Sequence, residues 1–212
     1  MKQNISEYWV GKTDRATVAA NHIEEMRLGF QNEITNSIKE TKVYDGRTCE
    51  FQGNYNKRYQ TTISVEPIDS VSAVLQSSGH TAVLNFASFK YPGGGFLAGS
   101  RAQEECLCHE STLYNVISAF PSFYEENQKM LNKALYHNRA LYSPNILFVR
   151  GDECKLCDVI TCASPNKTAA QSYQNVTDAE NYSYLRSRIN FILHMAASNN
   201  VDTLILGAFG CG

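Results

Sequence analysis

The sequence predicts an α/β fold, a three-layer α/β/α sandwich built on a mostly parallel sheet. Short apolar runs typical of buried strands alternate with helix-like segments over most of the 212-residue chain. A glycine-rich loop directly follows one apolar run and leads into a helix, as is expected where a parallel strand ends. No internal repeat, low-complexity tract or linker marks a domain boundary, so the chain is expected to fold as one domain overall.

The N-terminal part of the chain predicts helices and then an irregular connection. Residues 14–40 are polar and charged, and their apolar positions recur with the spacing of one helix face. Gly29 lies in this segment and is expected to interrupt the helix. Residues 44–59 contain several glycine and amide residues, which favours irregular chain. We expect residues 1–60 to form a helical accessory region packed on a core of residues 61–212.

The first half of this core alternates strand and helix around a long loop. An alternating pattern indicates the first strand, and an uninterrupted apolar run indicates a second, buried one. Pro121 is expected to separate two helices after the loop. The expected elements are a strand at 61–66, a helix at 68–76, a strand at 82–86, the loop at 88–102, and helices at 103–120 and 123–137.

The second half of the core predicts three more strands and a long helix. The apolar runs 146–149, 157–161 and 203–206 are short enough for buried strands. Thr177 and Glu180 have the spacing of a capping box, which begins a helix. The stripe of this helix that is expected to be buried consists of Tyr182, Leu185, Ile189, Ile192 and Ala196.

Charge and hydropathy exclude several function classes. The chain has 19 Lys and Arg against 21 Asp and Glu, a formal net charge of −2, which argues against direct DNA or RNA binding. No apolar run approaches the roughly 18 residues that a membrane span needs, and no apolar signal region follows the N-terminus. We therefore predict a cytoplasmic protein that does not bind membranes.

The seven cysteines are expected to be reduced thiols, because no secretion signal is present. Cys154 and Cys157 have the spacing of a zinc-ligand pair. A second pair that could converge on the same ion is not evident, since Cys106 and Cys108 would point apart on a helix. We expect Cys154 and Cys157 to be core residues and predict no metal site.

The loop at 88–102 carries the clearest functional signal. Gly93, Gly94 and Gly95 have no Cβ, so the backbone can adopt positive φ and bring its N–H groups against phosphate oxygens. A flexible surface turn is the alternative. The segment also fits the dinucleotide fingerprint G-x-G-x-x-A, but its helix begins too late, which leaves a nicotinamide enzyme as a minor alternative.

Glu104 and Glu105 begin the helix after this loop. The helix dipole alone favours carboxylates there, which is the structural alternative. Adjacent helical residues point about 100° apart, so the two side chains are expected to have different environments. A carboxyl whose pKa is raised by a neighbouring carboxylate and a bound diphosphate can act as a general acid in glycosidic cleavage. Asn85, at the end of the preceding strand, has the donors and acceptor to bind a ribose diol.

These residues carry a family resemblance. The three glycines, followed after seven residues by Gln103, Glu104 and Glu105, resemble the GGG-x6–8-QEE signature of poly(ADP-ribose) glycohydrolases, a branch of the macrodomains. The segments flanking this motif, with 158–166 and 206–212, are similar to the compact bacterial type. The likeness runs from about residue 61 to 212 and only loosely includes the N-terminal helices. It implies a macrodomain with a mixed, mostly parallel sheet and an N-terminal helical extension.

The resemblance also implies an activity and residue roles. The enzyme would hydrolyse the ribose–ribose O-glycosidic bond of poly(ADP-ribose), attached to proteins or free, and release ADP-ribose without a metal or cofactor. Glu105 would protonate the leaving ribose 2′-oxygen and then activate water, and Glu104 would orient the ribose hydroxyls. Asn85 would bind the distal ribose, and Gln103 would hold the loop and the start of the helix. The phosphate-binding residues would be Gly93, Gly94, Gly95 and Phe96 in the first loop and Gly207, Gly210 and Gly212 in the second.

One departure from the family bears on activity. Its members continue past the glycine-cysteine-glycine turn into an aromatic residue, a helix and a final strand, whereas this sequence is given to Gly212. A fragment or a short natural form would explain this, and either is expected to bind ADP-ribose more weakly. The alternative function is therefore an ADP-ribose-binding module without turnover. The paired glutamates argue against a third possibility, removal of mono-ADP-ribose from side chains or deacetylation of O-acetyl-ADP-ribose.

Overall fold

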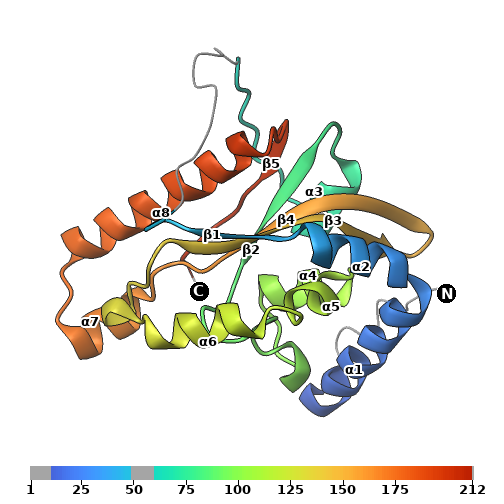
Figure 1. Cartoon of the computed structure of the whole chain (residues 1–212), viewed down its shortest axis with the longest axis horizontal. Coiled ribbons are helices and arrows are strands. Elements are labelled where there is room, and N and C mark those ends of the chain that lie inside the picture. Colours follow the sequence, from blue (N-terminus) through green and yellow to red (C-terminus); the bar gives the residue numbers. More distant parts are fainter. Residues whose placement is uncertain (1–10, 49–59, 212) are drawn as a thin grey trace.

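The computed structural model describes residues 11–48 and 60–211, which form a five-stranded sheet with the strand order β1-β3-β4-β2-β5 (Figure 1). The strands are β1 Lys42–Asp45, β2 Thr81–Phe86, β3 Arg139–Arg150, β4 Glu153–Cys162 and β5 Thr203–Ile205. β2 pairs in parallel with β4 and β5, whereas β3 pairs antiparallel with β1 and β4. The sheet is mixed as predicted, but parallel pairings are two of four and not the majority.

Helices cover both faces of this sheet, which confirms the three-layer α/β/α architecture. They are α1 Lys12–Gly29, α2 Gln31–Glu40, α3 Ser70–Gln76, α4 Gln103–His109, α5 Leu113–Ile117, α6 Pro121–Lys129, α7 Lys167–Gln174 and α8 Asp178–Ser198. α8 packs Phe191 and Met195 against Leu84 and Ile160 of one sheet face. Helices α1 to α6 contribute to the core on the other face, and Figure 1 shows the two layers on opposite sides of the strands.

β3 and β4 form one long antiparallel hairpin, and this is the reason that the sheet is less parallel than predicted. The runs 146–149 and 157–161 lie in its two arms. Gly151 and Asp152 alone connect the arms, and Gly151 has φ 62°. A two-residue turn whose glycine has positive φ matches the twist of a hairpin, so the local sequence contained this signal.

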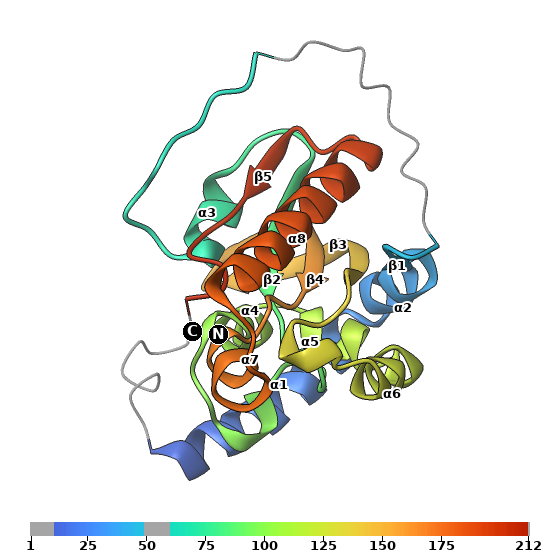
Figure 2. The ribbon, with the colours of Figure 1, turned by 90° about the vertical axis from the view of Figure 1, so that its left-hand side faces the viewer.

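The predicted strand at 61–66 is wrong. These residues run as extended chain without a strand partner in the described part of the protein, and Figure 2 shows them apart from the sheet. Ile63 and Val65 are 88% and 93% exposed. An alternating pattern favours a strand only where a neighbouring edge supplies backbone hydrogen bonds, and no described strand does so here. β1, in contrast, was not predicted, and it overlaps the start of the segment 44–59 that was expected to be irregular.

The predicted helix at 103–120 is divided into α4 and α5. Ser111 forms an isolated bridge with Phe148, and the N–H of Thr112 donates to the carbonyl of Leu147 at 3.0 Å. Backbone groups that a continuous helix would pair internally are therefore hydrogen-bonded to β3, and the helix is interrupted there. The helix predicted at 123–137 corresponds to α6 and is shorter, since α6 ends at Lys129.

The N-terminal helices pack directly on the core. The predicted interruption near Gly29 is confirmed, because α1 ends there and α2 begins at Gln31. Ala19 and Met26 of α1 and Ile34 of α2 are buried in the core cluster beside α5. The division of the chain at residue 60 stays a prediction.

The buried face of α8 differs from the predicted stripe. The capping box of Thr177 and Glu180 is confirmed. Ile192 and Ala196 are buried, but Tyr182 and Ile189 are exposed and Leu185 is only partly covered. The inward face instead contains Arg188, Phe191 and Met195. Arg188 turns inward because its guanidinium donates to the carbonyl of Ala163 and, at 2.7 Å, to Asn138 Oδ1.

Only one member of the Cys154 and Cys157 pair is a core residue. Cys157 is buried and Cys154 is exposed, since residues three apart on a strand face opposite sides. In residues 11–48 and 60–211, no group of three or more His, Cys, Asp or Glu side chains could hold a metal ion. No helix within the same two ranges is long and apolar enough to cross a membrane.

Candidate active site

The floor of the candidate site is formed where β2 and β4 end. Asn85 is fully buried, and its Nδ2 donates to Glu104 Oε1 at 3.1 Å and to Thr161 Oγ1 at 3.3 Å. Thr161 is the register partner of Asn85 on β4. Asn85 Oδ1 is also buried and has no hydrogen-bond partner among the described residues. An unpaired buried acceptor is costly, and a donor on a bound ligand, such as a sugar hydroxyl, would satisfy it.

The glycine loop lies directly over two carboxyl groups. Gly93 and Gly94 have φ of 67° and 58°, which favours glycine at both positions. A Cβ on Gly94 would lie 2.7 Å from Glu105 Oε1 and 3.0 Å from Glu104 Oε2. A Cβ on Gly93 would lie 2.7 Å from Cδ2 of Tyr114. The absence of side chains therefore lets the loop approach both glutamates.

Glu105 is held by both ends of the loop. Its Oε1 accepts from the N–H of Gly95 at 2.8 Å, and its Oε2 accepts from the N–H of Ala102 at 2.8 Å. The side chain is 5% exposed. These two bonds fix the plane of the carboxyl group beneath the loop.

Glu104 lies deeper, between Asn85 and the backbone of Ser88. Its Oε2 accepts from the N–H of Ser88 at 2.7 Å. Burial raises the pKa of Glu104 to about 8, and the charge of Glu105 adds to the rise, although the hydrogen bonds from Ser88 and Asn85 oppose it. Glu104 thus keeps its proton at neutral pH. The two adjacent carboxyl groups have the different environments that their helical positions predict.

Gln103 connects the start of α4 to β2. Its Oε1 accepts from the N–H of Phe86 at 2.8 Å, and its Nε2 donates to the carbonyl of Leu84 at 2.8 Å. Both bonds are made to backbone groups of β2 near its carboxyl end. This side chain therefore fixes the position of the two glutamates that follow it.

The amides of Gly94, Gly95 and Phe96 each donate to an acceptor within the protein. The N–H of Gly94 donates to the carbonyl of Tyr91 at 3.2 Å, and that of Phe96 donates to Gly93 at 2.9 Å, while Gly95 bonds Glu105. A bound diphosphate would have to replace one or more of these acceptors. The Phe96 side chain is fully buried against the rings of His109 and Tyr114.

The second glycine segment lies beside the end of β2. A Cβ on Gly207 would lie 2.9 Å from Phe86 Cζ, and the rings of Phe86 and Phe209 are 5.7 Å apart. Gly210, with φ 87°, lies next to Ser164 of the loop after β4. The structure thus brings Gly207 and Gly210 close to the carboxyl end of β2, where Asn85 lies. Gly212 lies outside the described residues.

Ser88, Tyr114 and Thr161 are the contributors that the sequence did not reveal. Ser88 is two residues beyond β2, so its position in the loop was the only available signal. Tyr114 and Thr161 reach the site from other elements, and their proximity depends on the fold.

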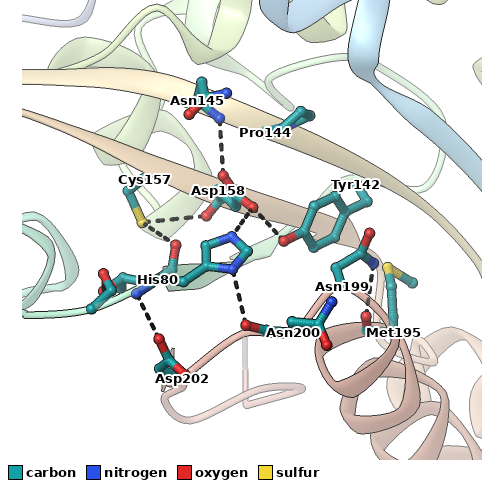
Figure 3. Close-up of polar contacts among 12 residues, drawn as sticks. His80, Tyr142, Pro144, Asn145, Cys157, Asp158, Met195, Asn199, Asn200 and Asp202 are labelled. Atoms are coloured by element: carbon teal, nitrogen blue, oxygen red, sulfur yellow. Dashed lines mark hydrogen bonds and ion pairs between the residues drawn. The ribbon is translucent and has the colours of Figure 1, made fainter. Parts of the chain in front are cut away.

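A separate cavity of about 620 Å³ lies at the opposite end of the sheet and contains none of the predicted site residues. Figure 3 shows its central cluster, in which Asp158 Oδ2 accepts from His80 Nε2 at 2.7 Å and from the Tyr142 hydroxyl. Asp158 Oδ1 accepts from the N–H of Asn145 at 3.0 Å, and His80 Nδ1 lies 3.0 Å from the carbonyl of Asn200. Since the carboxylate and both ring nitrogens have partners, we do not assign the reaction to this cavity.

The glycine-loop end therefore defines the class of protein. Two adjacent carboxyl groups in different environments, under a glycine loop at the carboxyl ends of parallel strands, are the groups that an acid–base glycosidase uses. The chain belongs to the family of microbial-type PARG catalytic domains, whose family model matches residues 13–151. The match begins within α1, so the likeness includes the N-terminal helices and is wider than the sequence motifs indicated.

Solved structures agree with this family. Poly(ADP-ribose) glycohydrolase (PARG) from Thermomonospora curvata is 26% identical, and the match covers 94% of this chain and 81% of that chain with a TM-score of 0.81. The enzyme from Deinococcus radiodurans in complex with ADP-ribose is 29% identical over 84% of this chain and 77% of that chain, with a TM-score of 0.74. A comparison with curated protein sequences gives no significant match.

Proposed function

We propose that this protein is a poly(ADP-ribose) glycohydrolase that hydrolyses the ribose–ribose O-glycosidic bond and releases ADP-ribose. The observation that carries this proposal is the position of Glu104 and Glu105 directly under Gly94. Family membership and the likeness to the ADP-ribose complex of the Deinococcus enzyme support the ligand class.

In this proposal Glu105 is the catalytic acid. In its protonated form it gives its proton to the leaving ribose 2′-oxygen as the bond from that oxygen to the anomeric carbon breaks. The resulting carboxylate then takes a proton from the water molecule that bonds to the anomeric carbon, which restores the acid. Its contacts with Gly95 and Ala102 support the assignment, because they orient the carboxyl group at the loop that would receive the diphosphate. No metal or cofactor takes part in these steps.

Glu104 and Asn85 bind the ribose in this proposal. A protonated Glu104 presents a donor as well as an acceptor to a sugar hydroxyl, and it places no second negative charge beside Glu105. The unpaired Oδ1 of Asn85 supplies another acceptor. Gly207 and Gly210 form a second phosphate contact across the end of β2.

The biological substrates would be polymers attached to ADP-ribosylated proteins, with ADP-ribose as product. A cytoplasmic location and the absence of direct DNA or RNA binding are further parts of the proposal. The slightly acidic charge balance supports the absence of direct DNA or RNA binding.

The test is release of ADP-ribose from purified poly(ADP-ribose), measured by chromatography, with the Thermomonospora enzyme as the positive control. We expect turnover by this protein. Calorimetry with ADP-ribose separates the remaining outcomes. Binding heat without turnover would identify a binding module, and neither heat nor turnover would overturn the assignment of the ligand.

A further inference from the structure

We propose that Arg15 of α1 is a positioning residue that holds the glycine loop in place relative to the carboxyl group of Glu105. The inference rests on the proposed function, because it concerns how that site is held. Arg15 belongs to the N-terminal helices and lies outside the glycine and glutamate motifs.

The contact that carries this inference joins α1 to the exit of the loop. Arg15 Nε donates to the carbonyl of Gly99 at 2.8 Å, across 84 positions of sequence. Gly99 has φ 72° and ends η2, the 3-10 turn Phe96–Ala98. The next amide, of Ser100, donates back to the carbonyl of Gly95 at 3.0 Å. Holding the Gly99 carbonyl therefore fixes the turn that closes the loop.

The same segment holds the proposed catalytic carboxyl group. Glu105 accepts from Gly95 on one side of the turn and from Ala102 on the other. Gly99 lies between these two donors in the chain. A shift of Gly99 would consequently move both donors relative to Glu105.

A second set of contacts shows that α1 also holds the chain after α4. His22 is buried, and its Nε2 lies 3.0 Å from the carbonyl of Ser111, just beyond α4. Asn115 Nδ2 donates to the carbonyl of Ile23 at 3.0 Å. Arg15 thus holds the chain before α4, and His22 with Ile23 holds it afterwards. α1 therefore contacts the chain before and after the helix that carries both glutamates.

The chemistry of the contact favours arginine over lysine. The guanidinium is planar, and its Nε–H is held in a fixed direction by the rigid group. A charged donor also makes a stronger bond to a carbonyl than a neutral donor does. An ammonium group at this position would keep the charge but lose the directed Nε–H.

The experiment compares Arg15→Met and Arg15→Lys with Arg27→Met as the matched control. Arg27 lies on the same helix, is exposed and pairs with Glu24 at 2.6 Å. For Arg15→Met we expect kcat to fall about tenfold, with a smaller change in KM, because misaligned catalytic groups reduce the rate more than binding. Arg15→Lys is expected to fall between Arg15→Met and the wild type, and Arg27→Met to match the wild type.

Hydrogen exchange of the backbone amides of residues 93–102 is measured on the same proteins. Each variant is compared only if its melting temperature equals that of the wild type. Faster exchange in Arg15→Met alone would support the inference. Wild-type kcat together with unchanged exchange in Arg15→Met would overturn it. If the wild-type protein itself releases no ADP-ribose, the proposed activity fails, and the exchange result alone then decides whether Arg15 holds the loop.

Discussion

The two ends of β2 carry similar chemical groups in opposite arrangements. At its start, the carboxylate of Asp158 is satisfied by His80, Tyr142 and the backbone of Asn145. At its end, Glu104 lies beside another carboxyl group, and Asn85 keeps a buried oxygen without a partner. Stability alone favours complete pairing, so the end that leaves an acceptor unpaired and two carboxyl groups adjacent is the one suited to bind and transform a ligand.

His80 shows how fully the first end is paired. Its two ring nitrogens lie 2.7 Å from Asp158 Oδ2 and 3.0 Å from the carbonyl oxygen of Asn200. A carbonyl can only accept, and an ionised carboxylate can only accept as well, so both nitrogens donate when both bonds are made. The hydrogen bond that His80 donates to Asp158 accordingly raises the pKa of His80 above its usual value.

The largest effect on ADP-ribose affinity is expected from adding a side chain at Gly94. In Gly94→Val, the new Cβ would lie against Glu105 Oε1. We predict that ADP-ribose affinity falls by about 100-fold, or about 2.8 kcal/mol, as measured by calorimetry. Gly151→Val is the control, because Gly151 also has φ near 60° but no neighbour within 4 Å of a Cβ. Equal affinity for ADP-ribose in the two variants would contradict the claim that binding needs the close approach of the loop backbone at Gly94.

A second prediction uses the raised pKa of Glu104. Because its native pKa is about 8 and its usual value is 4.5, the native state holds a proton that the unfolded chain releases between these values. The contribution of Glu104 to the free energy of unfolding should therefore decrease by up to about 1.4 kcal/mol per pH unit as pH rises through this range.

Urea unfolding of the wild type and of Glu104→Gln between about pH 5 and pH 8 measures this contribution. We expect the difference between the two proteins to change with pH, since glutamine does not titrate. A constant difference would show that Glu104 is ionised in the folded protein.

The smallest effect is expected at the paired end. Since the native pKa of His80 is raised, its stabilising contribution is fully present below pH 6.5 and is lost as pH rises through the native value. His80 is 41% exposed, so solvent screening limits this contribution to about 1 kcal/mol or less. We predict that Asp158→Asn returns the pKa of His80 toward 6.5 in an NMR titration. An unchanged titration would mean that Asp158 does not hold the imidazolium.

The two ends also differ in how far the sequence predicts them. Gly93 to Gly95, Glu104 and Glu105 belong to one strand–loop–helix unit, so contiguous residues predicted their proximity. The pairing of His80 with Asp158 joins residues 78 positions apart and depends on the register of β2 with β4. The sequence also did not predict the site contacts of Thr161, Tyr114 and Arg15, because these residues too are distant in sequence from their partners.

The fold errors have related physical causes. An uninterrupted apolar run correctly predicted β2, but such runs could not show that β3 and β4 pair with each other, because pairing depends on the turn at Gly151. The strand predicted at 61–66 has suitable residues without a neighbouring edge. Local patterns predict which residues can form a strand, whereas the neighbours decide whether one forms.

The most direct test of the central claim is the rate of ADP-ribose release by Glu105→Gln beside that of the wild type, with ADP-ribose affinity measured on both. Glutamine keeps the shape of the side chain and removes its transferable proton. We predict a rate reduced by about 100- to 10,000-fold with nearly unchanged affinity. A wild-type rate in Glu105→Gln would contradict the assignment of Glu105 as the catalytic acid.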